Sequence, residues 1–164
     1  MPALTTPTTR LHTAWLESHD EWGPGPHEDG FGLHPTDEIH SPTGFATWTA
    51  RLTSDPSGHA YWITEDNRVL GGIALRHGPT ELIRRAGHIG YGIRPSARGQ
   101  GLATWALAQI LDKARTTDLT RVLLVCAKDN KASARTIEHN GGIPEVDTHA
   151  TNTHRYWIDL NTEH

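Results

Sequence analysis

The segment YGIRPSARGQGLATWALAQIL, residues 91–111, decides how this chain folds. A short alternating stretch runs into a turn that contains two glycines, Gly99 and Gly101, and then directly into an apolar segment. From Leu102 to Ala114 apolar residues recur at steps of four, which is typical of one face of an amphipathic helix. The segment therefore predicts a strand, a glycine-rich turn and a helix in direct succession.

The glycine turn is a candidate anion site. The first N–H groups of a helix have no partner within the helix, and the helix dipole favours negative charge there, so a phosphate is the natural ligand. The turn has no lysine where the Walker phosphate loop needs one, and Thr104 stands where the dinucleotide fingerprint needs a glycine. The alternative without a ligand is a tight connection that only permits left-handed backbone before a helix.

The rest of the chain alternates between helical and extended patterns. We expect helices over residues 9–22 and 41–52, joined by a Gly-, Pro- and His-rich loop over residues 23–40 that is typical of a binding lid. After them we expect a hairpin over 59–77 that turns at Asp66-Asn67, and a segment over 79–87 that is ambiguous between a loop and a short helix. The expected strands are 87–93, a buried strand over 121–127, 143–146 and 154–160. The expected helices between them are 102–116 and 129–142. This order predicts a single α/β domain.

The strand over residues 87–93 has one nearly bare face. Ile89, Tyr91 and Ile93 form its apolar face, while the opposite face carries two glycines, Gly90 and Gly92. A face without side chains lets another group approach the backbone closely. We therefore expect a group that approaches the backbone of this strand closely.

Composition narrows the class of partner. The 164 residues carry a net charge of −4 with 21% charged residues, so no basic surface predicts nucleic acid or an anionic membrane as a partner. The single cysteine, Cys126, excludes an internal disulfide, and no apolar run approaches the roughly 20 residues that span a bilayer. The spacing of the twelve histidines matches no metal motif, so we expect no metal. The composition favours a cytoplasmic protein with a small-molecule partner.

Arg98, Gly101 and Ala103 follow Ile93-Arg94-Pro95 at the turn, and the later helix begins with Asn130 and Ser133 and ends at Gly141-Gly142. In these residues the chain is similar to the GNAT superfamily of acetyl-CoA-dependent N-acetyltransferases. The superfamily pattern Arg/Gln-x-x-Gly-x-Gly/Ala is met by Arg98, Gly101 and Ala103. Its context is met as well, by Ile93-Arg94-Pro95 before the turn, an apolar strand after the helix, and a following helix that begins with Asn130 and Ser133 and ends at Gly141-Gly142. The resemblance covers most of the chain. It implies one N-acetyltransferase domain over residues 1–164 with a mixed, mostly antiparallel sheet that is splayed at the cofactor strand and flanked by helices. Residues 55–148 would form the acetyl-CoA-binding part, and residues 9–54 the N-terminal helices and the acceptor-side loop.

The resemblance also implies the cofactor-binding residues. Backbone donors in the glycine turn would bind the diphosphate of acetyl-CoA. The pantetheine arm would lie between the strand ending at Ile93 and the strand around Val125, and this would explain the bare face of the first strand. The alternative role of Asn130 is to cap a helix, and the alternative role of Ser133 is to pack as a small residue. The expected cofactor-binding residues are Tyr91, Gly92, Ile93, Arg98, Gly99, Gln100, Gly101, Leu102, Ala103, Thr104, Asn130 and Ser133.

Acetyl transfer to an amine needs a base, an oxyanion site and a proton for the departing thiolate. His88 is the expected base, with a half-buried histidine bonded to backbone as its alternative, and His77, Glu81 and His154 as further candidates. Many members of the superfamily have a tyrosine that protonates the thiolate at the position where this chain has Ile137. Four tryptophans are interpreted as core residues, with an acceptor pocket as the alternative: Trp15, Trp48, Trp62 and Trp157.

The expected function is transfer of an acetyl group from acetyl-CoA to a primary amine of a small molecule, such as an amino sugar, amino acid, polyamine or amine antibiotic, by direct attack. A protein N-terminus or lysine is the alternative acceptor. A CoA-binding sensor without catalysis is the alternative from another class, and Ile137 at the acid position favours it. A dinucleotide oxidoreductase is a third possibility. Homodimers are common in the superfamily, so a homodimer is possible here.

Overall fold

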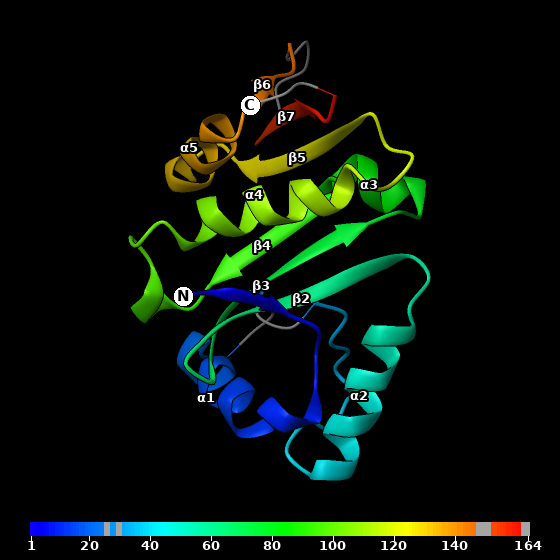
Figure 1. Ribbon diagram of the computed structural model, residues 1–164, viewed down its shortest axis with the longest axis vertical. Coiled ribbons are helices and arrows are strands. Elements are labelled where there is room, and N and C mark those ends of the chain that lie inside the picture. The colour runs from blue at the N-terminus through cyan, green and yellow to red at the C-terminus, as the bar shows by residue number, and fades with distance from the viewer. Residues whose placement is uncertain (25–26, 29–30, 147–151, 162–164) are drawn as a thin grey trace.

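The computed structural model describes residues 1–24, 27–28, 31–146 and 152–161 (Figure 1). Part of the expected long loop (residues 25–26 and 29–30) and the end of the expected cofactor-binding part (147–148) lie outside the described residues. The helices are α1 (His12–Trp22), α2 (Pro42–Ser54), α3 (Thr80–Ala86), α4 (Leu102–Ala114) and α5 (Lys131–His139), with 3-10 turns at Thr9–Leu11 and Pro95–Ala97. The strands are β1 (Ala3–Thr5), β2 (Gly58–Glu65), β3 (Arg68–Arg76), β4 (Ile89–Ile93), β5 (Arg121–Ala127), β6 (Ile143–Pro144) and β7 (Thr153–Asp159).

The strands form two sheets that meet along a seam between β4 and β5. The first sheet has the order β1-β2-β3-β4 and the second β5-β7-β6, and every ladder between described strands is antiparallel. Across the seam β4 and β5 run toward the same side of the molecule (Figure 1), which gives the mixed arrangement expected for this fold. The described strands meet at one isolated bridge, between Gly87 and Leu124. Beyond that bridge, toward Ile93 and Ala127, the seam is open.

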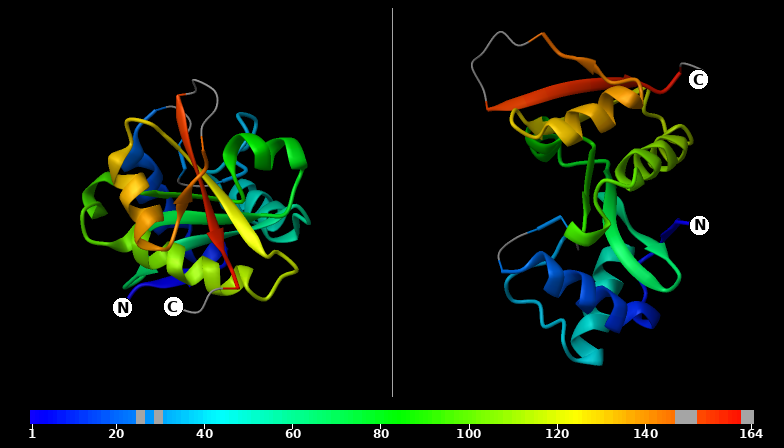
Figure 2. Two further views of the ribbon diagram at one scale, coloured as in Figure 1. Left: turned by 90° about the horizontal axis from the view of Figure 1, so that it is seen from above. Right: turned by 90° about the vertical axis from the view of Figure 1, so that its left-hand side faces the viewer.

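Helices cover both faces of the first sheet, as the side view in Figure 2 shows. The helices α1 and α2 cover one face, where Trp15, Phe45, Trp48 and Trp62 are buried together. The opposite face packs against α4 through a larger core that continues into the second sheet. Successive residues of β2 belong to the two cores, since Trp62 faces the first and Ile63 the second. The first sheet is therefore buried on both sides and forms a rigid frame for the seam.

Local sequence signals account for most element boundaries. The Ser41 hydroxyl accepts a hydrogen bond from the Gly44 N–H at the start of α2, and Pro42 occupies its first turn. Asp66 and Asn67 have positive φ angles of 52° and 62°, which the two-residue turn of a hairpin requires. The segment that was ambiguous in sequence forms the short helix α3. The strand β1 was not expected, because three residues are too few to show an alternating pattern.

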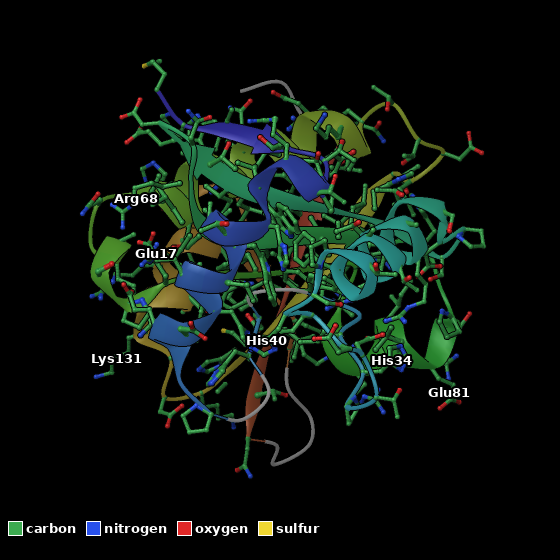
Figure 3. The ribbon with its side chains drawn as sticks, turned by 90° about the horizontal axis from the view of Figure 1, so that it is seen from below. Glu17, His34, His40, Arg68, Glu81 and Lys131 are labelled. Carbon is green, nitrogen blue, oxygen red and sulfur yellow. The ribbon has the colours of Figure 1, made fainter. Side chains whose placement is uncertain are left out.

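A buried arginine ties α1 to the end of β4. The Arg94 side chain is 4% exposed, and its guanidinium contacts the carboxylates of Glu21 at 2.8 Å and Glu17 at 3.2 Å. Glu21 also accepts hydrogen bonds from the N–H and hydroxyl of Ser96. Glu17 in turn lies beside Arg68 at the surface (Figure 3). This network fixes the C-terminal end of α1, and so the start of the long loop, against the glycine turn.

Replacement of Glu21 by glutamine is expected to lower the free energy of unfolding by about 1–3 kcal/mol at neutral pH, because a buried guanidinium loses its charge-assisted partner. The hydrogen bond from Arg94 lowers the pKa of Glu21 to about 2 from an ordinary value of 4.5. A lowered pKa adds stability above the ordinary value, and this stability is lost as the pH falls toward about 2. The difference between parent and variant, measured by urea unfolding, should therefore shrink across that range. Glu17→Gln is the control, with a smaller loss because the Glu17 side chain is 56% exposed.

Other features of the fold bear on expectations from composition. Cys126 is buried on β5 as a free thiol. Within the described ranges, no group of three or more His, Cys, Asp or Glu side chains is placed to hold a metal ion. In the same residues, no helix combines the length and the apolar character that crossing a membrane requires.

Candidate functional site

A cavity of about 1220 Å³ opens at the splayed end of the seam. Its walls come from β4, the glycine turn, the first turn of α4, the end of β5 and the first two turns of α5. Of the cofactor-binding residues expected from the sequence, all except Gln100 line this cavity. These residues are separated by up to 42 positions in the chain, so the fold brings the expected set together at one place.

The glycine turn forms one end of the cavity. Gly99 and Gly101 have φ angles of 77° and 79°, a left-handed conformation that favours glycine. A Cβ atom built at either position would meet no atom within 4 Å, so both residues border open space. Gly101 is the N-cap of α4, and no side chain caps this helix start. The first N–H groups of α4 therefore remain available to an anion, which fits a diphosphate.

Arg98 closes one side of the glycine turn. Its Nε donates a hydrogen bond to the Ile93 carbonyl at 2.9 Å, and its guanidinium carbon lies 5.0 Å from the centre of the Trp22 ring. These contacts hold the guanidinium at the rim of the cavity, next to the start of α4. That Arg98 also contacts a bound anion stays an expectation from the sequence.

The opposite wall carries a hydrogen-bonded pair from β4 and α5. The Tyr91 hydroxyl lies 2.7 Å from Ser133 Oγ, and burial raises the pKa of Tyr91 to about 12. The Asn130 side chain caps α5 by accepting a hydrogen bond from the Ser133 N–H at 3.1 Å, which is the alternative role considered for it. Ile137 is 1% exposed, so the position of the usual tyrosine is filled by an apolar side chain. Ser133 does more than pack, because it orients the Tyr91 hydroxyl.

The chain itself covers the bare face of β4. A Cβ atom at Gly92 would approach Glu28 Cβ to 2.8 Å and a ring carbon of Trp22 to 3.0 Å. A Cβ atom at Gly90 would lie 2.7 Å from a terminal nitrogen of Arg76. The expectation that this face is kept bare for the pantetheine arm is therefore wrong. The glycines make room for side chains from the long loop and from β3, whereas the open edge of β4 faces the seam.

Glu28 and Arg76 face the cavity from this covered side. Desolvation raises the pKa of Glu28 above its usual range, and the positive charge of Arg76 partly opposes that effect. Glu28 as a residue is exposed, and it lines the cavity. A carboxylate of raised pKa at a cavity is a better proton acceptor than an ordinary glutamate.

His88 is placed differently from what the sequence suggested. It is not among the residues that line the cavity. Its ring Nδ1 accepts a hydrogen bond from the backbone N–H of Leu123 at 2.9 Å, and its backbone N–H donates to the Leu123 carbonyl at 2.7 Å. Burial and the nearby His77 lower the pKa of His88. Because the basic lone pair is bonded to backbone, the structure does not support His88 as the base, and its visible role is to join β4 to β5.

The further candidates lie away from the cavity. His77, Glu81 and His154 are exposed and do not line it, and Glu81 lies at the periphery in Figure 3. Of the four tryptophans named above, Trp15, Trp48 and Trp62 are buried in the core between α1, α2 and the first sheet. Trp157 is half-buried beneath the guanidinium of Arg121. These residues therefore form core and surface contacts rather than an acceptor pocket.

Sequence reasoning missed Glu28, Arg76 and Trp22. Two signals pointed toward them: the loop over residues 23–40 had the composition of a binding lid, and the glycines of β4 required a close neighbour. Neither signal identifies which loop residue reaches the glycines, because that depends on how α1 packs on the sheet. The register of β3 with β4, which places Arg76 beside Gly90, also had to be seen in the structure.

Comparison with known proteins shows the family of this chain. The family described as acetyltransferase (GNAT) domain matches residues 10–143. Comparison with curated protein sequences gives no match.

Several solved structures share the fold. The microcin C7 self-immunity acetyltransferase MccE, solved with acetyl-CoA and AMP, is 14% identical, with a TM-score of 0.68 over 96% of this chain and 92% of its own. RimJ from Mycobacterium smegmatis, solved with CoA-disulfide, is 22% identical, with a TM-score of 0.68 over 97% of this chain and 86% of its own. The spermidine/spermine N-acetyltransferase SpeG from Vibrio cholerae is 14% identical, with a TM-score of 0.66 over 97% and 94%. At these identities the likeness shows the fold.

Proposed function

This chain belongs to the family of GNAT acetyltransferases and uses acetyl-CoA, and from that premise we propose that it acetylates a primary amine of a small molecule by direct attack. The observation that carries the proposal is the cavity at the open seam. It joins an uncapped helix start at Gly101, the free edge of β4 and the carboxylate of Glu28 in one space. Acetyl-CoA supplies an acyl group activated as a thioester.

The residues of the cavity fit this cosubstrate. The turn from Gly99 to Thr104 presents backbone N–H groups and no covering side chain to a diphosphate. Asn130 and Ser133 offer polar groups along the way to β4. The edge of β4 from Tyr91 to Ile93 faces the open seam and offers backbone donors for the developing oxyanion. These assignments stay proposals.

Glu28 is the proposed base. It accepts one proton of the ammonium group, and the amine nitrogen then bonds to the acetyl carbon. As the carbon–sulfur bond breaks, the nitrogen loses its second proton, which replaces the proton that the departing thiolate takes up, so that one proton, held by Glu28, is released overall. Its position over Gly92 sets it beside the proposed oxyanion donors. Cys126 also lines the cavity, but burial raises the pKa of its thiol, so it is poorly suited to act as a nucleophile. This supports direct attack without a covalent acetyl-enzyme.

Tyr91 is the proposed proton donor for the departing thiolate. Its hydroxyl lies on the cavity wall and stays protonated at neutral pH, since its pKa is raised to about 12. Ser133 Oγ holds this hydroxyl in place from α5. In this proposal Tyr91 on β4 protonates the thiolate, the role that a tyrosine at position 137 would otherwise have.

Tyr91→Phe is expected to lower kcat about 100-fold, within the range that general acid catalysis contributes. The affinity for acetyl-CoA should change little, because the ring is kept. Tyr156→Phe is the matched control: that hydroxyl is also buried, bonds Glu138 at 2.8 Å, and does not line the cavity. The measurement is kcat of both variants by steady-state kinetics. An equal decrease of kcat in both variants would contradict the role of Tyr91 as the proton donor.

The proposed function is tested with acetyl-CoA and a panel of amines, by following release of the free thiol and the mass of the products. The panel contains amino acids, amino sugars, polyamines, amine antibiotics and a peptide with a free N-terminus. Acetylation of small amines in preference to the peptide is the expected result. Tight CoA binding without turnover on any amine would instead favour a sensor.

The remaining proposals concern surroundings and assembly. We place the enzyme in the cytoplasm, which the single unpaired cysteine supports. A homodimer remains a proposal, and one solved structure of similar fold, a spermidine N-acetyltransferase from Vibrio cholerae, is described as dodecameric.

A further inference from the structure

The register of β3 and β4 gives the acceptor side of the cavity a charged pair. Gly72 pairs with Gly92 and Ala74 with Gly90, so these four residues point to the same face of the sheet. Arg76, two residues beyond Ala74, shares that face. In this part of β3 and β4 the other positions of this face are glycine or alanine, and the Arg76 guanidinium lies against Gly90 and the Glu28 side chain against Gly92.

The Arg76 guanidinium has donors left for a ligand. It is half-buried, and one terminal nitrogen donates to the Gly87 carbonyl at 3.2 Å. Among the residues that the structure describes, no carboxylate lies within ion-pairing distance of it. A guanidinium presents five N–H donors, so most of them are not used by the protein. A partly buried guanidinium with free donors on a cavity is a site for an anionic group.

Glu28 is the complementary group. Within the described ranges its carboxylate has no hydrogen-bond donor, and the nearby charge that acts on it is Arg76. Gly90 and Gly92, which the two side chains cover, are two strand positions apart, which is about 7 Å. Among the described residues no ion pair joins Glu28 to Arg76, although the charge of Arg76 acts on Glu28, so each group can bind a separate part of one ligand.

The other charges of the cavity are positive. Glu28 is the sole acid among the described residues that line it, whereas Arg76, Arg85, Arg98 and Arg135 line it as well. A polyamine carries two or more positive charges and meets one carboxylate here. When an amine also carries an anionic group, its positive ammonium can face Glu28 and its anionic group can face Arg76, so that both contacts join opposite charges.

Building on the proposed acetyltransferase function, we propose that the acceptor carries a carboxylate or phosphate close to its amine, that Arg76 binds this anionic group, and that Glu28 binds the amine. Arg76 thereby acts as a specificity-determining residue. Amino acids and aminoalkyl phosphates have this arrangement of charges. Polyamines and neutral amino sugars lack it.

The test compares matched acceptors that differ in the anionic group alone. Leucine is paired with leucinamide and phosphoethanolamine with ethanolamine, and spermidine represents the polyamines. For the parent enzyme we expect kcat/KM to be at least about 10-fold higher for the anionic member of a pair, the scale of one charge-assisted hydrogen bond. Arg76→Gln should remove this preference and leave KM for acetyl-CoA unchanged, and Arg76→Lys should restore part of it.

Arg84→Gln is the matched control, because Arg84 is exposed on α3 and does not line the cavity. Thermal stabilisation of the acetyl-CoA-bound protein by each amine gives a second readout that needs no turnover. Equal kcat/KM and equal stabilisation within every pair would overturn the proposal, as would a preference that Arg76→Gln leaves intact. Preferred acetylation of spermidine would overturn it while supporting the acetyltransferase function. Failure to bind acetyl-CoA would count against the proposed function itself.

Discussion

Gly101→Glu is expected to abolish acetyl-CoA binding. Gly101 is the N-cap of α4 and borders open space at the end of the cavity. A glutamate here would place its carboxylate among the first N–H groups of the helix, where the diphosphate is expected. Two like charges about 4 Å apart repel by roughly 4 kcal/mol at an effective dielectric constant of about 20, which is about a 1,000-fold loss of affinity.

The control separates charge from backbone strain. Gly101 has a φ angle of 79°, so any other residue at this position is strained by about 1–2 kcal/mol. Gly101→Gln carries the same strain and nearly the same volume without the charge. Binding of acetyl-CoA by calorimetry should be far weaker for the glutamate variant, while circular dichroism and the melting temperature should be alike for both. If both variants bind as the parent does, the turn is only a connection and the cofactor assignment fails.

Glu28→Gln is expected to lower kcat by about 100-fold to 10,000-fold, the range that a positioned base contributes. Binding of acetyl-CoA should be unchanged, because Glu28 lies on the covered face of β4 and away from the glycine turn. Stability at neutral pH should be equal or slightly higher. A carboxyl group whose pKa is raised by desolvation is destabilising once it is ionised, and glutamine has no charge to desolvate.

The pH dependence makes this prediction more specific. A base works in its deprotonated form, so kcat/KM of the parent should rise with pH through the raised pKa of Glu28, above the range of an ordinary glutamate. This limb should disappear in the glutamine variant. Glu81→Gln makes the same chemical change at an exposed position outside the cavity and should keep the parent profile. A Glu28 variant with the parent profile would contradict the assignment of Glu28 as the base.

Local patterns were enough to predict the fold and the residues that line one end of the cavity. The turn needs glycine at the left-handed positions 99 and 101, and the helix after it has a clear apolar period. Asn130 is a sequence signal of a helix start and does cap α5. In each case the physical cause lies within a few residues of the chain.

The acceptor side could not be predicted in the same way. Glu28 meets Gly92 across 64 positions, and Tyr91 meets Ser133 across 42, through packing of whole elements. The histidine at position 88 had the right pKa range for a base, but its ring lone pair is engaged by the backbone of a strand that comes 35 positions later. Long-range contacts of this kind leave no local periodicity in the sequence.

The described residues between Gly23 and His40 lie between two helices and belong to no strand. Insertions, deletions and substitutions among them therefore shift no strand register, and the backbone of the turn that carries Gly99 and Gly101 keeps its own conformation. Natural variation can reshape the acceptor side while the machinery that holds the acyl donor is retained. One scaffold can in this way give rise to enzymes with unlike substrates, and divergence among relatives should concentrate in this stretch.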